Sequence, residues 1–228
     1  MQYDYARPTD KKKEDKAKKT KTVKLVCLGV AVTCVIAAAI VAVVWFTNNV
    51  SVDGKMVHKN LVVDCNGLTV YLGQEIDPVD VADEMDLPII EKVSDAKAGV
   101  AGVGVEGKFI VYLQKSGREY YVSGWKILEE GISYAGISVG DDIEDVVKLF
   151  PEGQAYGRDG TGTAVFYVYF DMDGNVYNTA QIWKLWNEAA KSKSELAKFK
   201  SEYPALLVEW DPYSGEVTSI KLTVSVEE

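Results

Sequence analysis

The chain has 228 residues, of which 34 are acidic and 25 are basic, and its net charge is −9 at pH 7. Residues 1–24 alone carry +5, which leaves −14 for residues 25–228. A segment this acidic is repelled by phosphate backbones, so the composition argues against a nucleic-acid-binding protein.

The N-terminal part predicts a membrane anchor. Residues 1–24 form a lysine-rich tail, and residues 25–46 are an uncharged apolar run that, as a helix, reaches about 33 Å and can cross a bilayer. Positive charge beside a span favours the cytoplasmic side. We therefore expect a cytoplasmic tail, a single-pass helix over 25–46 in the lipid bilayer of the cell membrane, and an extracellular C-terminal domain.

A cleaved secretory signal also has a basic start and an apolar middle. Signal cores are usually 7–15 residues long and end in a small-x-small site. This run is longer and ends in Val43-Val44-Trp45-Phe46. The pattern favours an anchor over a cleaved signal.

Residues 47–64 are expected to be a juxtamembrane segment that connects the span to the domain. Beyond the span the chain has a single cysteine, Cys65, so no disulfide can form inside the domain. An external domain without disulfides suggests a bacterial protein.

The external part contains an internal repeat. Residues 72–77 are echoed by residues 139–144, each a glycine turn and an acidic helix start followed by apolar residues at helical spacing. Val79, Ala82 and Met85 are the expected inward face of the first helix, and Val146, Leu149 and Phe150 that of the second. Downstream, residues 122–127 resemble residues 217–222, and each follows a strand and a turn. We therefore predict an α+β domain of two helix-plus-antiparallel-sheet units, 65–135 and 136–228.

The pattern from Gly136 to Val146, followed by Phe150-Pro151 and the hairpin 211–222, resembles the β-lactamase-inhibitor-protein-like fold. Related domains occur in small outer-membrane assembly lipoproteins and in surface proteins of Gram-positive bacteria. The resemblance implies short helices on one face of an antiparallel sheet, often in tandem, with the other face free to bind a protein partner. It implies no catalytic residue and no cofactor.

The second unit is longer than the first, and the added length coincides with a predicted amphipathic helix over about 179–203, ended by Pro204. Trp183 and Trp186 are large apolar side chains of the kind that anchor protein interfaces. The alternative is that both tryptophans pack onto the sheet and only cover the core.

The predicted strand 164–171 is apolar or aromatic on both faces, whereas a sheet with one wet face should alternate with polar residues. Either the inserted helix covers the second face, or Tyr167 and Tyr169 stand on an exposed recognition surface. Both readings remain open at this stage.

Candidate chemistry is sparse. Asp171-Met172-Asp173-Gly174-Asn175 resembles the start of a calcium loop, but the residue in the twelfth position is Ile182 rather than glutamate, and Asp-Gly is also a turn signal. The single histidine, His58, has no patterned partner for a triad or a multi-histidine metal site. The acidic pairs Asp141-Asp142 and Glu129-Glu130 lie at a helix start and beside a turn.

The sequence therefore predicts a membrane-anchored surface protein with a non-catalytic protein-binding domain and no metal or cofactor. Its candidate binding residues are Tyr167, Tyr169, Trp183 and Trp186, and its expected partner is an extracellular or envelope protein. Two alternatives remain. The first is a cell-envelope enzyme that acts on glycan through paired carboxylates, and the second is a structural subunit of a membrane complex.

Overall fold

The computed structural model describes residues 30–65, 67–90, 100–105, 107–157 and 164–224. The chain divides into two compact units, Met1–Asn48 and Asn49–Glu228. The described part of the first unit is the helix Val30–Asn48, whose mean hydropathy is 2.6 and whose length allows it to cross a membrane. An N-terminal apolar helix is therefore present and is compatible with a membrane anchor or a signal peptide. It ends two residues after the predicted boundary, and residues 25–29 lie outside the described residues.

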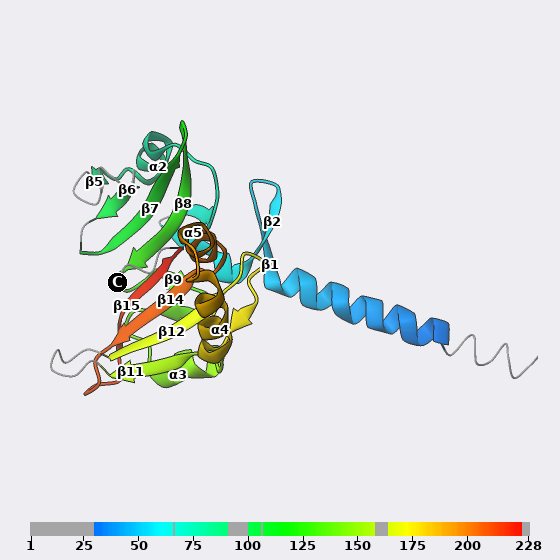
Figure 1. Cartoon of the computed structure of the whole chain (residues 1–228). Helices are drawn as coiled ribbons and strands as arrows, with labels where there is room; N and C mark the ends of the chain where they lie inside the picture. The colour runs from blue at the N-terminus through cyan, green and yellow to red at the C-terminus, as the bar shows by residue number, and fades with distance from the viewer. Residues whose placement is uncertain (1–29, 66, 91–99, 106, 158–163, 225–228) are drawn as a thin grey trace, which may run out of the picture. The chain divides into compact units, whose positions relative to one another are not determined.

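The second unit is built on a nine-stranded antiparallel sheet (Figure 1). This mixture of helices with an antiparallel sheet confirms the predicted α+β class. Along the sheet the strands follow the order β11, β12, β14, β15, β8, β7, β6, β5, and β13 pairs with β12. Their bounds are β5 Ile89–Ile90, β6 Val100–Val105, β7 Phe109–Ser116, β8 Glu119–Ile127, β11 Gln154–Gly157, β12 Ala164–Phe170, β13 Val176–Tyr177, β14 Ala205–Trp210 and β15 Val217–Thr223.

One face of the sheet forms the hydrophobic core. A row of cross-strand neighbours runs over five strands and is fully buried: Val111, Trp125, Leu222, Leu206 and Val168. Side chains alternate between the two faces of a strand, so these positions place every second residue of each strand in the core. The indole ring of Trp125 packs edge-on against Tyr134, with ring centroids 5.5 Å apart.

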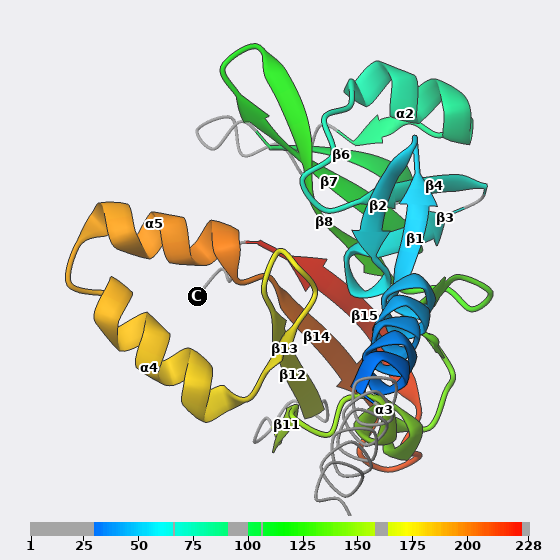
Figure 2. The same ribbon diagram turned by 90° about the vertical axis from the view of Figure 1, so that its right-hand side faces the viewer.

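Short elements cover this core face, while the helices α4 (Thr179–Ala189) and α5 (Lys193–Glu202) lie on the other side of the sheet (Figure 2). The covering elements are β1 Asn49–Val52, β2 Lys55–His58, the 3-10 turn Lys59–Leu61, β3 Val62–Cys65, β4 Leu68–Tyr71, α2 Pro78–Met85, β9 Ser133–Tyr134, β10 Ile137–Ser138 and α3 Ile143–Leu149.

Residues 47–64, which we expected only to connect the span to the domain, contribute to the core instead. Val52, Val57 and Leu61 are buried there. The 3-10 turn is held to the rest of the domain by Asn60, whose side-chain amide donates to the Gly174 carbonyl at 3.1 Å. Tyr134 donates its hydroxyl hydrogen to the Asn60 carbonyl. The segment 47–64, predicted to be a linker, is therefore part of the fold because several of its apolar residues are buried.

The first predicted helix face was partly wrong. Val79 is 53% exposed, and Val81 is buried in its place. The helix begins at Pro78, after Asp77 accepts a hydrogen bond from the Val79 amide, so its start lies later than the acidic run suggested. In α3, Val146 and Phe150 are buried as predicted, whereas Leu149 is exposed.

The repeated segments make the same backbone hydrogen bonds in both halves. The amide of Gly73 donates to the Val122 carbonyl at 2.8 Å, and the amide of Gly140 donates to the Val217 carbonyl at 2.8 Å. One residue further on, Val122 donates back to Gln74 and Val217 donates back to Asp141, both at 2.8 Å. Each glycine has a positive φ angle, +80° and +93°, a region that favours glycine.

The predicted single helix over 179–203 is wrong, because the segment folds as two helices, α4 Thr179–Ala189 and α5 Lys193–Glu202. Asn178 and Gln181 form a capping box at the start of α4. The Ser192 hydroxyl accepts from the Glu195 amide and caps the start of α5. The apolar spacing in the sequence continues across this break between the two helices. We refer to residues 179–203 as the helical hairpin.

Candidate functional site

The second face of the sheet carries the predicted binding tyrosines. One row of cross-strand neighbours consists of Ile110, Lys126, Lys221, Leu207, Tyr167 and Gln154. The adjacent row consists of Tyr112, Gly124, Thr223, Ala205, Tyr169 and Tyr177. We call these two rows, together with Tyr156 on the edge strand β11, the tyrosine face.

Tyr167 lies toward the edge of this face. Its ring packs edge-on against Tyr156, with ring centroids 5.7 Å apart, and Tyr156 is 42% exposed. Tyr167 itself is half-buried. Tyr169 is also half-buried, and burial, followed by the neighbouring Tyr167 and Tyr156, raises the pKa of its hydroxyl. The Tyr169 hydroxyl is thus a neutral hydrogen-bonding group near pH 7.

The helical hairpin is attached beside Tyr169. Tyr177 is the direct neighbour of Tyr169 on β13, and its ring lies 5.4 Å from Tyr203 at the end of α5. Tyr203 in turn stacks on the buried Phe199 at 5.0 Å. The hairpin thus packs near Tyr169, whereas Tyr167 lies beside the exposed Tyr156. The role of the two tyrosines in recognition stays a prediction.

Trp183 and Trp186 stack on each other on α4, with ring centroids 5.3 Å apart and an interplanar angle of 14°. Trp183 is 61% exposed, and Ile182 is the residue of this helix that is buried. The reading in which both tryptophans only cover the core is thus wrong for Trp183. Among the described residues, ring contacts do not join the two tryptophans to Tyr167 or Tyr169.

Two lysines in the middle of the tyrosine face were not singled out from the sequence. Lys126 and Lys221 are directly opposed on β8 and β15. The ammonium group of Lys221 lies 6.0 Å from the centre of the Tyr112 ring. The sequence did contain a signal for them, because the two lysines occupy equivalent positions in the repeated segments 122–127 and 217–222.

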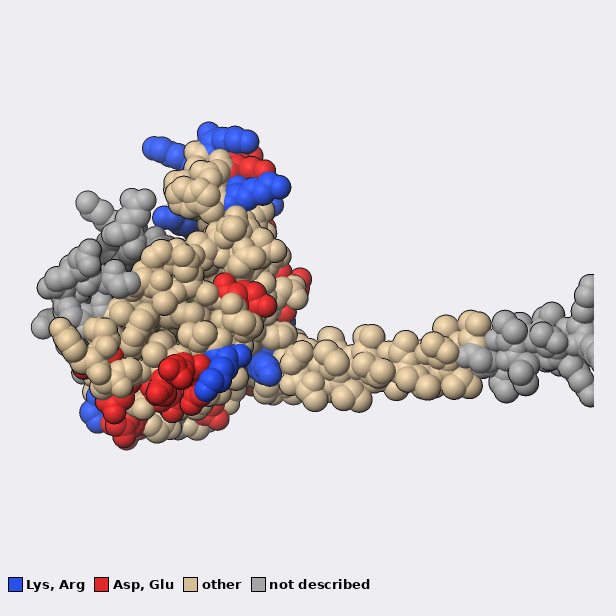
Figure 3. Space-filling view, turned by 90° about the horizontal axis from the view of Figure 1, so that it is seen from below, with Lys and Arg blue, Asp and Glu red and all other residues tan. Residues whose placement is uncertain are grey.

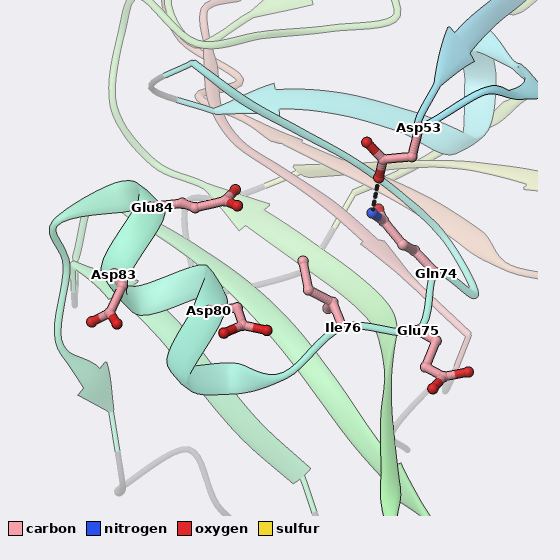
Figure 4. A pocket seen from close by; sticks show the side chains of 7 residues that line it. All are labelled: Asp53, Gln74, Glu75, Ile76, Asp80, Asp83 and Glu84. Carbon is pink, nitrogen blue, oxygen red and sulfur yellow. Dashed lines mark hydrogen bonds between the residues drawn. The ribbon is translucent and has the colours of Figure 1, made fainter.

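An acidic pocket lies on the other half of the domain (Figure 4). Its volume is about 330 Å³, and the residues that line it are Asp53, Gln74, Glu75, Ile76, Asp80, Asp83 and Glu84. The buried Gln74 donates to the Asp53 carboxylate at 2.9 Å and accepts from the Tyr71 amide. Figure 4 shows Glu75 and Asp83 pointing away from the other carboxylates. Sequence reasoning missed this pocket because it joins the segment 47–64 to α2.

Three of the four carboxylates singled out from the sequence make contacts within the domain. Asp142 accepts from the Glu144 amide and caps α3, and Asp141 accepts from the Ser138 amide at 2.7 Å. Glu129 pairs with Lys108 at 2.7 Å on the surface. These residues do not line the acidic pocket.

The loop that resembles a calcium site uses its carboxylate internally. Asp171 accepts hydrogen bonds from the amides of Asp173 and Asn175, from the Asn175 side chain and from the Tyr177 hydroxyl. Partial burial opposes ionisation of Asp171, but these hydrogen bonds outweigh it and lower the pKa of the carboxyl. Within the described ranges, no group of three or more histidine, cysteine, aspartate or glutamate side chains could hold a metal ion.

The single histidine lies beside this loop. His58 Nδ1 accepts from the Asn60 amide at 3.2 Å, and a side chain at Gly174 would meet the imidazole ring at 2.2 Å. Burial, followed by the charge of Lys59, lowers the pKa of His58, and Asp171 partly opposes this shift. The imidazole is thus a neutral structural acceptor near pH 7.

No protein-family model matches the chain, and none of the curated proteins matches it. A search of solved structures found similarity to an extracellular protein containing a SCP domain from Bacillus anthracis str. Ames. The identity is 12% and the TM-score is 0.34, with 67% of this chain and 43% of that chain covered. The chain spans less than half of that structure, and a likeness at this level carries no argument about function.

Proposed function

We propose that this chain is a membrane-anchored surface protein whose external domain binds a protein partner without catalysis. The binding surface is the tyrosine face together with the exposed part of the helical hairpin. One observation carries the proposal: aromatic side chains remain accessible on the face of the sheet that does not form the core, where Tyr156 is 42% exposed, and on α4, where Trp183 is 61% exposed. Tyrosine and tryptophan are the residues most enriched at interface hot spots.

The orientation follows from the charge beside the span. The lysine-rich tail carries +5 and stays in the cytoplasm, so the domain from Asn49 onward is extracellular. The N-terminal apolar helix Val30–Asn48 supports an anchor. Labelling of an Asn48→Cys variant with a membrane-impermeant maleimide, with Cys27, Cys34 and Cys65 replaced by serine, tests this, because labelling only after permeabilisation contradicts the orientation.

The domain is proposed to be a tandem of two related units, as the resemblance to the β-lactamase-inhibitor-protein-like fold implies. The equivalent hydrogen bonds of Gly73 and Gly140 support this. The strand order gives further support, because β8 and β15, the last strands of the two halves, pair in the centre of the sheet. In such a tandem, the face opposite the short helices is continuous over both units.

Site-specific photo-crosslinking tests the binding function. We place a photoreactive phenylalanine at Tyr167 in one variant and at Tyr213 in the control variant, and irradiate intact cells. Tyr213 is 91% exposed and lies in the turn after β14, so it is accessible without belonging to the tyrosine face. The proposal expects a discrete adduct with an envelope or extracellular protein from position 167, weakened by Tyr169→Ala, and none from position 213. Equal adducts from both positions contradict it.

The acidic pocket supports a second candidate, an envelope enzyme that cleaves glycan through two carboxylates. Asp80 and Glu84 lie one helical turn apart on α2, and both line the pocket of about 330 Å³. Release of soluble fragments from purified cell wall by the full-length protein, lost in both Asp80→Asn and Glu84→Gln, would favour this candidate. If the unaltered protein releases no fragments, the enzyme candidate is excluded.

A further inference from the structure

Lys126 and Lys221 form a like-charged pair in the centre of the sheet. They are direct cross-strand neighbours, flanked on one side by the pair Ile127 and Ile220 and on the other by Trp125 and Leu222. The flanking residues are all buried in the core, so the lysines project from the tyrosine face. Directly opposed side chains have Cβ atoms about 4.5–5.5 Å apart, where like charges destabilise the sheet.

Among the residues that the structure describes, neither lysine belongs to an ion pair, and the ion pairs there involve Lys108, Lys148 and Lys198. The carboxylate next to the pair, Glu209, accepts a hydrogen bond from the Ser219 hydroxyl at 2.8 Å. Both lysines are half-buried, so solvent screens their mutual repulsion less than it screens charges on an open surface.

The surface around the pair differs in charge from the rest of the domain. The two rows of the tyrosine face contain two lysines and no carboxylate, although residues 25–228 carry −14. Glu209 lies in the next row, between Val165 and Ser219. The helical hairpin beside the same face has five lysines and three glutamates, a net charge of +2. Figure 3 shows lysine and arginine gathered on the projecting part at the top, with most of the visible acidic side chains on the opposite side.

We infer that the tyrosine face binds an acidic polypeptide segment, with carboxylates against Lys126 and Lys221 and apolar or aromatic side chains against Leu207, Tyr167 and Tyr112. This inference rests on the proposed protein-binding function and names the chemistry of the partner. Carboxylates relieve the repulsion of the lysine pair, and the residues on both sides of the pair offer contact area that a bare polyanion could not use.

The size of the row sets the length of the segment. From Ile110 to Tyr167 the row crosses five adjacent strands, and strands lie about 4.8 Å apart, so this part of the row extends over about 19 Å. An extended chain at about 3.3 Å per residue covers this distance with about six residues. The partner segment therefore has two central acidic residues with apolar or aromatic residues on both sides.

The test uses the full-length protein in zwitterionic nanodiscs and a labelled synthetic peptide with two central glutamates between leucine and tyrosine. The same peptide with glutamines is the comparison ligand, and polyphosphate is a second one. The protein variants are Lys126→Glu/Lys221→Glu and, as a control of equal net charge, Lys108→Glu/Lys148→Glu. Because the basic tail is identical in both variants, any binding of the peptide to the tail cancels.

We expect the first variant to lose at least about tenfold in affinity, which is about 1.4 kcal/mol, and the control to stay within about twofold. Equal losses in both variants, or equal binding of the glutamine peptide, overturn the inference. Polyphosphate binding that matches the acidic peptide and depends on Lys126 and Lys221 also overturns it, since the face then takes any polyanion. Lys126→Gln/Lys221→Gln removes the like-charge repulsion and should also lose affinity, and a cooperative thermal unfolding transition of this variant then excludes unfolding as the cause.

The photo-crosslinking experiment separates this inference from the proposed function. An adduct at position 167 that persists unchanged in Lys126→Glu/Lys221→Glu keeps the binding function and overturns the acidic-segment inference. An adduct lost in that variant but retained in Lys108→Glu/Lys148→Glu supports both. Equal adducts at positions 167 and 213 contradict the binding function whatever the peptide does.

Discussion

The two faces of the central sheet have different roles although they share every strand. On β12, Phe166 is 1% exposed and packs in the core, whereas the next residue, Tyr167, is half-buried on the opposite face. The core face is covered by short elements from residues 49–150, and the tyrosine face is covered mainly at the base of the helical hairpin. The comparison teaches that aromatic residues on both faces of a strand do not make both faces core.

The largest expected effect compares these two neighbours directly. Phe166→Ala removes a fully buried ring and should lower the free energy of unfolding by about 3–5 kcal/mol. Tyr167→Ala removes a half-buried ring and should cost about 1 kcal/mol or less. Urea unfolding of both variants, followed by tryptophan fluorescence, measures the difference. Equal losses would show that the tyrosine face is core.

The contact between Gly174 and His58 tests whether the tightly packed core includes the loop after β12. Gly174 has a φ angle of +81°, and a Cβ atom there would meet the His58 ring at 2.2 Å. Gly174→Ala should therefore destabilise the domain by about 2–3 kcal/mol, from backbone strain and a forced shift of His58. Gly54→Ala is the matched control, because its φ angle is +76° and no atom lies within 4 Å of the added Cβ. A smaller thermal shift for Gly54→Ala is expected, and similar shifts would mean that strain alone acts.

Removal of a helix cap should have different effects on the two sides of the sheet. Asp142→Ala removes the cap of α3, which packs in the core through Val146, and should lower global stability by about 1 kcal/mol. Ser192→Ala removes the cap of α5 in the hairpin and should increase local opening of that helix with less global change. Amide hydrogen exchange of both variants distinguishes the outcomes. Global loss in Ser192→Ala would place the hairpin within the cooperative core.

The smallest effect concerns pH. The pKa of His58 is lowered in the folded state, so the folded domain binds this proton less readily than the unfolded chain. The resulting stability is present above about pH 6.5 and is lost as pH falls through the folded pKa. Asp171, whose pKa is also lowered, acts in the same direction at lower pH, below about 3.9.

Because His58 is the only histidine, the loss of stability as pH falls below about 6.5 should weaken in His58→Asn, whose side-chain oxygen can still accept from the Asn60 amide. Thermal unfolding at several pH values checks this. An unchanged pH profile in His58→Asn would assign the dependence to carboxylates.

The strands and turns of the sheet were accessible from the sequence because alternation and turn residues are local signals. The hairpin 206–222 and the strand at 164–170 show this, as does the apolar helix at the N-terminus. The break at Ser192 was missed because the apolar spacing continues through it. The exposure of Val79 was missed because Val79 and Val81 are both apolar, and only packing decides which of them is buried. The acidic pocket and the role of residues 47–64 depend on contacts between distant segments.

The sequence by itself determined the apolar helix, the α+β class and the identity of the aromatic residues, because hydropathy and periodicity act over a few neighbouring residues. Only the tertiary structure decided which face of each strand is core, since that depends on which elements pack over it. It also decided that Lys126 and Lys221, 95 positions apart, face each other across two strands. Pairing of distant strands is a property of the whole domain, and no local pattern specifies it.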